Sequence, residues 1–138
     1  MSANLFGTAE SDKRILVVDF GAQYAQLIAR RVRESNVYSE IVSHELDAEN
    51  FAELKPSGII FSGGPASVNV EGAPKIDPAI YELGVPILGI CYGAQLIAQQ
   101  NGGSVEGNEK GEYGRTVVNV NESGILLSGV ETSTQQVW

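Results

Sequence analysis

Three short, continuous runs of apolar residues constrain the fold of this chain more than any other feature of its sequence. They lie at residues 15–18, 59–61 and 85–90. An uninterrupted apolar run of this length is typical of a strand that is buried on both faces of a parallel sheet. A further strand is predicted at residues 39–43.

Segments with helical character separate these strands. In residues 23–34, apolar side chains such as Leu27 and Ile28 recur at helical spacing between polar ones. Asp77 and Pro78 provide an N-cap and a first helical residue. The predicted helices span residues 23–34, 48–54, 78–83 and 94–100. Strands that alternate with helices predict a three-layer, flavodoxin-like α/β fold, with a mostly parallel sheet in the order 2-1-3-4 and helices on both of its faces.

The two ends of the chain depart from this regular pattern. Residues 1–12 have no periodicity and are predicted to form a disordered tail. After residue 103 the pattern changes to short alternating segments at 116–120 and 125–127. The last residues, 136–138, have neither a capping signal nor a closing helix after them. We therefore expect residues 13–138 to form a domain that is incomplete at its C terminus, as in a fragment of a longer protein.

Composition excludes several classes of function. Nine Lys and Arg residues against seventeen Asp and Glu residues give a net charge of −8, which disfavours nucleic acids and anionic membranes as partners. A single cysteine, Cys91, and a single histidine, His44, leave no disulfide framework and little material for a metal site. Without a secretory signal or a long apolar run, the chain is expected to be cytoplasmic.

Glycine-rich turns follow three of the predicted strands, at residues 19–21, 62–65 and 91–93. Because sites in parallel α/β sheets lie at the carboxyl ends of the strands, these turns are the candidate site. The last turn has the spacing Gly-x-Cys-x-Gly of a nucleophile elbow, in which small neighbours let the strand and helix meet and the helix N terminus favours a thiolate. The spacing alone fits an inert, buried cysteine equally well.

The Ser-Gly-Gly-Pro turn at residues 62–65 favours the catalytic interpretation. Consecutive glycines let a backbone N–H approach a ligand closely, as an oxyanion hole requires. Together with the amide of Tyr92, this turn would supply two donors to a tetrahedral oxyanion. An isolated turn of this kind is more often an ordinary turn, but two such turns at neighbouring strand ends are harder to explain in that way.

The segments at residues 19–24, 61–65 and 89–95 together resemble class I glutamine amidotransferases. The resemblance extends over residues 14–138 and includes the Glu-Tyr-Gly sequence at 112–114. The Gln-Tyr pair after the first strand and the Cys-Tyr-Gly sequence are most similar to the branch of the family that supplies ammonia for the amination of XMP to GMP.

The resemblance implies roles for particular residues. Cys91 matches the nucleophile, and the amides of Gly64 and Tyr92 match the oxyanion hole. Gly63 and Gln95 match positions that hold the substrate glutamine. The implied reaction is attack of the Cys91 thiolate on the glutamine carboxamide, loss of ammonia, and hydrolysis of a glutamyl thioester.

The resemblance also implies partners outside this chain. In that branch, ammonia reaches an ATP-pyrophosphatase domain, in the same chain or on a separate subunit, which uses ATP and Mg²⁺. The full-length form is compatible with a homodimer. This chain itself is expected to bind glutamine and to hold no cofactor or metal.

The chain departs from the family at the catalytic base, because it has no His-Pro-Glu motif. In the expected strand order, His44 and Cys91 lie three strand spacings apart, roughly 14 Å at about 4.8 Å each. His44 is therefore predicted to be an exposed or capping residue, and these 138 residues alone are predicted to hydrolyse glutamine poorly.

Two other interpretations remain open. One is a non-catalytic, flavodoxin-like binding or regulatory module, and the other is a class I amidotransferase of another pathway. A receiver domain is disfavoured because the third strand ends in Ser62, where a phosphoacceptor aspartate is expected.

Overall fold

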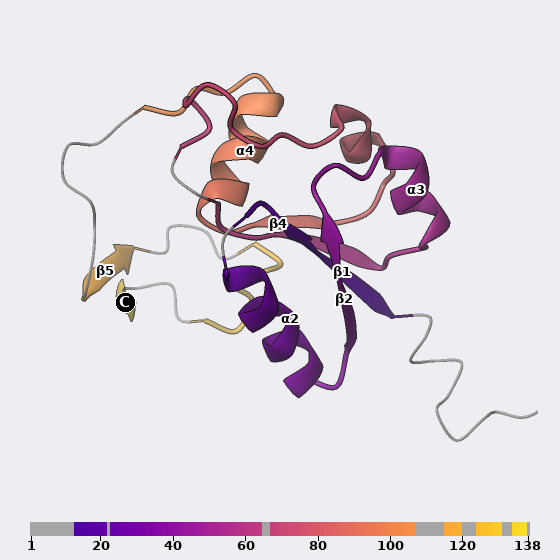
Figure 1. Ribbon diagram of the computed structural model, residues 1–138. Coiled ribbons are helices and arrows are strands. Elements are labelled where there is room, and N and C mark those ends of the chain that lie inside the picture. The colour runs from indigo at the N-terminus through magenta and orange to yellow at the C-terminus, as the bar shows by residue number, and fades with distance from the viewer. Residues whose placement is uncertain are drawn as a thin grey trace, which may run out of the picture. The chain divides into compact units, whose positions relative to one another are not determined.

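A four-stranded parallel sheet forms the centre of the first of two compact units, Met1–Val105 and Glu106–Trp138 (Figure 1). The computed structural model describes residues 13–21, 23–64, 67–106, 115–119, 124–130 and 134–137. The strands are β1 (Arg14–Asp19), β2 (Tyr38–Ser43), β3 (Gly58–Phe61) and β4 (Ile87–Gly89). Their order, β2-β1-β3-β4, confirms the prediction, and all three pairings are parallel.

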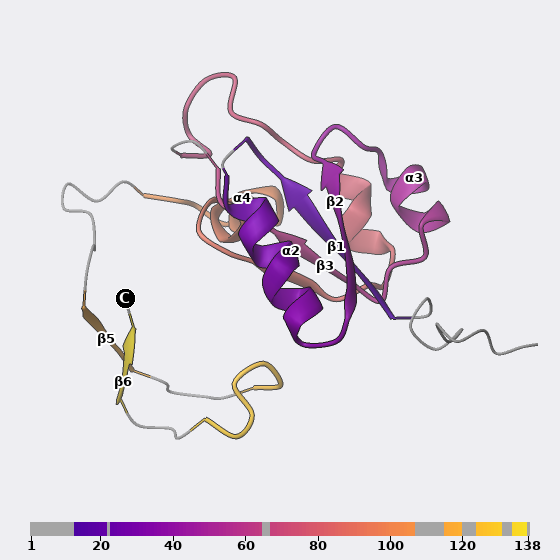
Figure 2. The same cartoon turned by 60° about the horizontal axis from the view of Figure 1, so that its bottom comes forward.

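Helices cover both faces of this sheet, as predicted (Figure 2). On one face lies α2 (Tyr24–Glu34), whose Ala25 and Ala29 pack on Val17. The opposite face carries α3 (Ala48–Glu53), η1 (Pro78–Glu82) and α4 (Tyr92–Gln100). The segment η1 is a short 3₁₀ helix, and its first bond runs from Ile80 N–H to the carbonyl of Asp77.

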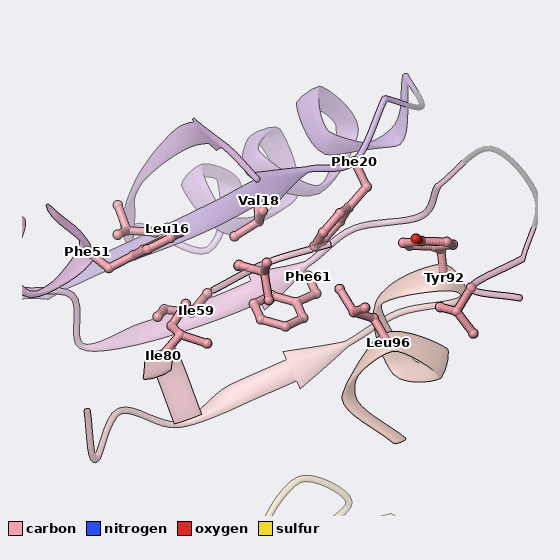
Figure 3. Close-up of a cluster of buried hydrophobic side chains, with 11 residues drawn as sticks. Leu16, Val18, Phe20, Phe51, Ile59, Phe61, Ile80, Tyr92 and Leu96 are labelled. Carbon is pink, nitrogen blue, oxygen red and sulfur yellow. The ribbon is translucent and has the colours of Figure 1, made fainter. Parts of the chain in front are cut away.

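The main core lies between the sheet and the second group of helices (Figure 3). Leu16 and Val18 of β1 point into it, while Val17 points toward α2, as the alternation of a strand requires. The cluster continues to the carboxyl ends of the strands, where Phe20 contacts Tyr92 with ring centroids 5.5 Å apart. The core therefore extends to the edge of the sheet where the predicted site lies.

The second unit contains an antiparallel pair of strands, β5 (Thr116–Asn119) and β6 (Thr134–Val137). The alternating segment at 125–127 belongs to a series of turns over residues 124–130, where Ile125 is 97% exposed. The predicted tail at 1–12 and the Glu-Tyr-Gly sequence at 112–114 lie outside the described residues. Among the residues that are described, every helix is too short or too polar to cross a lipid bilayer.

Candidate active site

Cys91 occupies the turn between β4 and α4 in an unusual backbone conformation. Its φ is 53° and its ψ is −113°, in a region that side-chain-bearing residues rarely adopt. Hydrogen bonds hold the turn on both sides: Ile90 N–H donates to the Phe61 carbonyl at 3.0 Å, and Gly93 N–H to the Ser62 carbonyl at 3.2 Å. Strain that the surrounding structure maintains in this way is common at catalytic sites.

Gly89 and Gly93, two positions before and after Cys91, lie so close to neighbouring backbone atoms that there is no room for a side chain. A Cβ atom at Gly89 would lie 2.6 Å from the backbone nitrogen of Ala94. At Gly93 a Cβ would overlap the carbonyl oxygen of Phe61. The Gly-x-Cys-x-Gly spacing is thus the spacing that lets β4 enter α4 through a turn this tight.

The side chain of Cys91 is exposed, so the alternative of a buried, inert cysteine does not apply. Cys91 also precedes the first residue of α4, where the unpaired N–H groups and the helix dipole favour an anion. The exposed sulfur therefore has the access that a nucleophile needs.

The Ser-Gly-Gly turn lies beside Cys91 because β3 and β4 are neighbours. Ser62 is fully buried, and its Oγ donates to the Val18 carbonyl at 2.6 Å. A Cβ at Gly63 would lie 4.0 Å from that of Cys91. Among the described turns and loops, neither the N–H of Gly64 nor the N–H of Tyr92 donates a backbone hydrogen bond.

One pocket brings several of these residues together. It has a volume of about 320 Å³, and it is lined by Tyr24, Leu27, Ile28, Gly63, Gly64, Ile90 and Cys91. A larger hollow of about 730 Å³ lies along α2 beside Asp19, but no cysteine, serine or threonine is among its lining residues. The pocket at Cys91 is therefore the candidate active site.

Two residues singled out from the sequence lie outside this pocket lining. Gln95 is half-buried, and its Oε1 accepts from the N–H of Val68 at 3.5 Å. Tyr92 contributes its backbone to the turn, but its ring is buried in the core. The oxyanion and glutamine-binding roles of Gly63, Gly64, Tyr92 and Gln95 remain predictions.

His44 lies at the far edge of the sheet from Cys91. It follows β2, and β1 and β3 separate that strand from β4. Its Nδ1 lies 3.1 Å from the Lys75 carbonyl, and its ring stacks on Phe20. His44 is half-buried in a structural role, and no group of three or more His, Cys, Asp or Glu residues in the described ranges is placed to hold a metal ion.

Sequence reasoning missed the apolar wall of the pocket. Tyr24 and Leu27 belong to the apolar positions of the predicted amphipathic helix, yet they are 62% and 52% exposed. Both side chains line the pocket beside Cys91. The Gln-Tyr pair that follows the first strand is the sequence signal that marks this position.

Comparison with known proteins defines the class of this chain. Residues 16–137 match the glutamine amidotransferase class-I family, and the chain belongs to that family. Among its relatives, a GMP synthase [glutamine-hydrolyzing] of Nocardia farcinica is 55% identical over 130 residues, which are 94% of this chain and 24% of the relative. A GMP synthase [glutamine-hydrolyzing] of Thermobifida fusca is 55% identical over 124 residues, 90% of this chain and 23% of the relative.

A solved structure supports the same assignment. A protein described as a GMP synthase subunit, from Thermoplasma acidophilum, superposes with a TM-score of 0.77 and 32% identity over 91% of this chain and 63% of that one. The predicted family and fold class are thus confirmed. The chain spans about a quarter of the length of the curated relatives it matches.

Proposed function

We propose that this chain is the glutamine-hydrolysing part of a GMP synthase, which releases ammonia from glutamine for the amination of XMP to GMP. The observation that carries the proposal is the exposed Cys91, which lies on a strained turn and lines a pocket of about 320 Å³. The names of the relatives at 55% identity support the choice of pathway over other amidotransferases.

The pocket walls suit the side chain of glutamine. Tyr24, Leu27, Ile28 and Ile90 provide apolar surface for its two methylene groups. Gly63 leaves room for the carboxamide beside Cys91, because it carries no side chain and a Cβ there would lie 4.0 Å from the Cβ of Cys91. Binding at this position would place the carboxamide carbon within reach of the sulfur.

The chemistry then proceeds in two steps. The Cys91 thiolate forms a bond to the carboxamide carbon, and the N–H groups of Gly64 and Tyr92 stabilise the oxyanion. The carbon–nitrogen bond breaks, and ammonia leaves with a proton from a general acid, which we expect in sequence that the relatives have and this chain does not span. Water then hydrolyses the glutamyl thioester to glutamate and restores the thiol.

We expect ATP and Mg²⁺ to bind outside the described residues of this chain. The sequence has no Gly-x-x-x-x-Gly-Lys-Ser/Thr phosphate loop, and the described ranges place no three acidic side chains together. We propose that both bind to an ATP-pyrophosphatase domain or subunit, which corresponds to the part of the relatives that this chain does not span.

The test uses the full-length protein and its Cys91→Ala variant. We expect glutamine-dependent formation of GMP to fall by at least about 10³-fold. Formation of GMP from added ammonium chloride should remain, because free ammonia bypasses Cys91. Persistence of glutamine hydrolysis in the variant would contradict the proposal.

A second measurement separates the proposal from a non-catalytic binding module. A glutamine-like chloroketone should alkylate Cys91 faster than iodoacetamide does, with saturation, and excess glutamine should protect the thiol. Equal and slow labelling by both reagents would instead support the non-catalytic module.

A further inference from the structure

The ring of Tyr92 lies directly against the backbone of Gly64. Tyr92 is only 2% exposed, and a Cβ atom at Gly64 would lie 2.5, 2.7 and 2.9 Å from three atoms of the Tyr92 ring. Gly64 thus packs its α-carbon on the face of this aromatic side chain. Figure 3 shows the ring of Tyr92 at the end of the core, near Phe20.

The hydroxyl of Tyr92 holds a second point on the same segment of chain, because it donates a hydrogen bond to the carbonyl oxygen of Pro74. The segment between Gly64 and Pro74 leaves the carboxyl end of β3 and returns toward η1. One side chain therefore contacts this segment at both of its ends.

Side chains of α4 also bind the returning part of the segment. Gln100 donates to the Ile76 carbonyl at 2.9 Å, and Gln99 accepts from Lys75 Nζ at 2.6 Å. These bonds fix the segment near residues 75 and 76. At Gly64, by contrast, the three atoms that lie nearest to a Cβ built on the backbone all belong to the ring of Tyr92.

We propose that Tyr92 is a positioning residue. Its side chain fixes the position of the Gly64 N–H relative to the N–H of Tyr92 itself. The inference rests on the proposed function, in which these two groups form the oxyanion hole. Because Tyr92 is the first residue of α4, its backbone carries one donor and its rigid ring locates the other. Donors that are fixed before the reaction stabilise the transition state without reorganisation.

The experiment compares the full-length wild-type protein with Tyr92→Leu and Tyr92→Phe. Removal of the ring in Tyr92→Leu should lower kcat for glutamine hydrolysis by about 10- to 100-fold and leave KM within about threefold, because an oxyanion hole acts mainly in the transition state. Tyr92→Phe retains the ring and loses only the bond to Pro74. Its kcat should fall by about threefold or less.

Tyr81→Leu is the matched control. Tyr81 packs against the same core and is partly buried. Its hydroxyl donates to Gln100 Oε1 at 2.6 Å, and the rings of Tyr81 and Phe61 form an edge contact with their centroids 6.2 Å apart. The three atoms nearest to a Cβ built at Gly64 all belong to Tyr92, and none belongs to Tyr81. Tyr81→Leu should lower the melting temperature as Tyr92→Leu does, but kcat should stay within about twofold of the wild type.

Labelling of Cys91 provides a readout that a purely structural role would not change. Attack on a glutamine-like chloroketone develops an oxyanion, whereas displacement of iodide from iodoacetamide does not. In Tyr92→Leu the chloroketone rate should fall about tenfold relative to the iodoacetamide rate. If Tyr92→Leu does not fold, Tyr92→Phe tests the positioning role instead. In Tyr92→Phe the ratio of the chloroketone rate to the iodoacetamide rate should fall by about two- to threefold.

The outcomes separate the two proposals. An active wild type with an unchanged kcat and an unchanged labelling ratio in the Tyr92 variants would overturn the positioning role alone. A rise in KM at constant kcat would overturn it as well, because it would indicate substrate binding. A wild type without Cys91-dependent hydrolysis would overturn the proposed function, and the positioning role with it.

Discussion

At the scale of single residues, backbone conformation distinguishes Cys91 from its surroundings. Among the described residues, only three non-glycine residues have a positive φ: Asn36, Lys55 and Cys91. Asn36 and Lys55 follow the ends of α2 and α3, where a left-handed residue commonly closes a helix. Cys91 instead begins a helix, and the strain coincides with an exposed nucleophile beside a pocket.

Gly64→Ala tests the contact with Tyr92 directly. The new methyl group must displace the Tyr92 ring or the turn, so the free energy of unfolding should fall by about 1–3 kcal/mol. In combination with Tyr92→Leu, the loss should be smaller than the sum of the two single losses, with a coupling of at least about 0.5 kcal/mol. Urea unfolding of the four proteins measures it.

Gly63→Ala is the control for stability, because a Cβ at Gly63 would meet Tyr24 at an ordinary 3.6 Å. If the losses in the free energy of unfolding for Gly64→Ala and Tyr92→Leu are additive, the Gly64 backbone and the Tyr92 ring are not in tight contact.

At the scale of elements, the local sequence pattern was sufficient to predict the strands and helices of the first unit. It was not sufficient to predict which side chains of these elements contact one another. The continuous apolar runs predicted β1 and β3, because nearly every residue of a strand that is buried on both faces is apolar. The third run predicted β4 as well, although the residues of β4 are only half-buried. The exposure of Tyr24 could not be predicted, since the helical period shows an apolar stripe but not which part of it a neighbour covers. The bond from Tyr92 to Pro74 joins residues 18 positions apart and leaves no local signal.

Asp77 links two elements, and its carboxylate makes the link sensitive to pH. It accepts from the N–H of Ala48, at the start of α3, at 2.9 Å and from that of Ala79 in η1 at 3.1 Å. These two bonds, that of Ala48 foremost, hold the pKa of Asp77 below its ordinary value of 3.8. A lowered pKa stabilises the fold above that value, and the contribution is lost as the pH falls through the folded pKa.

Asp77→Asn should therefore weaken the dependence of the melting temperature on pH in the range from about pH 5 to pH 2. The amide still accepts hydrogen bonds, so the helix cap should persist at neutral pH. Asp77→Ala should lower the melting temperature at every pH in the series. An acid-range slope in Asp77→Asn as steep as in the wild type would rule out this role.

At the scale of the whole molecule, the site contains a nucleophile but no base within reach among the described residues. The turns, the strand order and the separation of His44 from Cys91 could be predicted, because parallel topology fixes which strand ends are neighbours. The sequence pattern does not fix where a main-chain N–H group points, because every residue type except proline provides one, so the oxyanion roles of Gly64 and Tyr92 stay predictions. The base is predicted to come from sequence that the relatives have and this chain does not span.

The 138-residue chain alone should therefore hydrolyse glutamine at less than about 1% of the rate of the full-length protein, because a general base contributes about 10²- to 10⁴-fold. His44→Ala should leave the activity of both the 138-residue chain and the full-length protein unchanged. Ammonia release, measured with a coupled glutamate dehydrogenase assay, tests both statements. Turnover by the short chain at the full-length rate, or its loss in His44→Ala, would show that a base is already present.

The packing of Gly64 on Tyr92 has a consequence for protein engineering. The loop after β3 and the first turn of α4 form a matched pair, although they are separate in the sequence. A chimaera that takes one of them from a relative with a different residue after the nucleophile would leave a void or an overlap at this junction. Transplants between amidotransferases should therefore exchange both segments together.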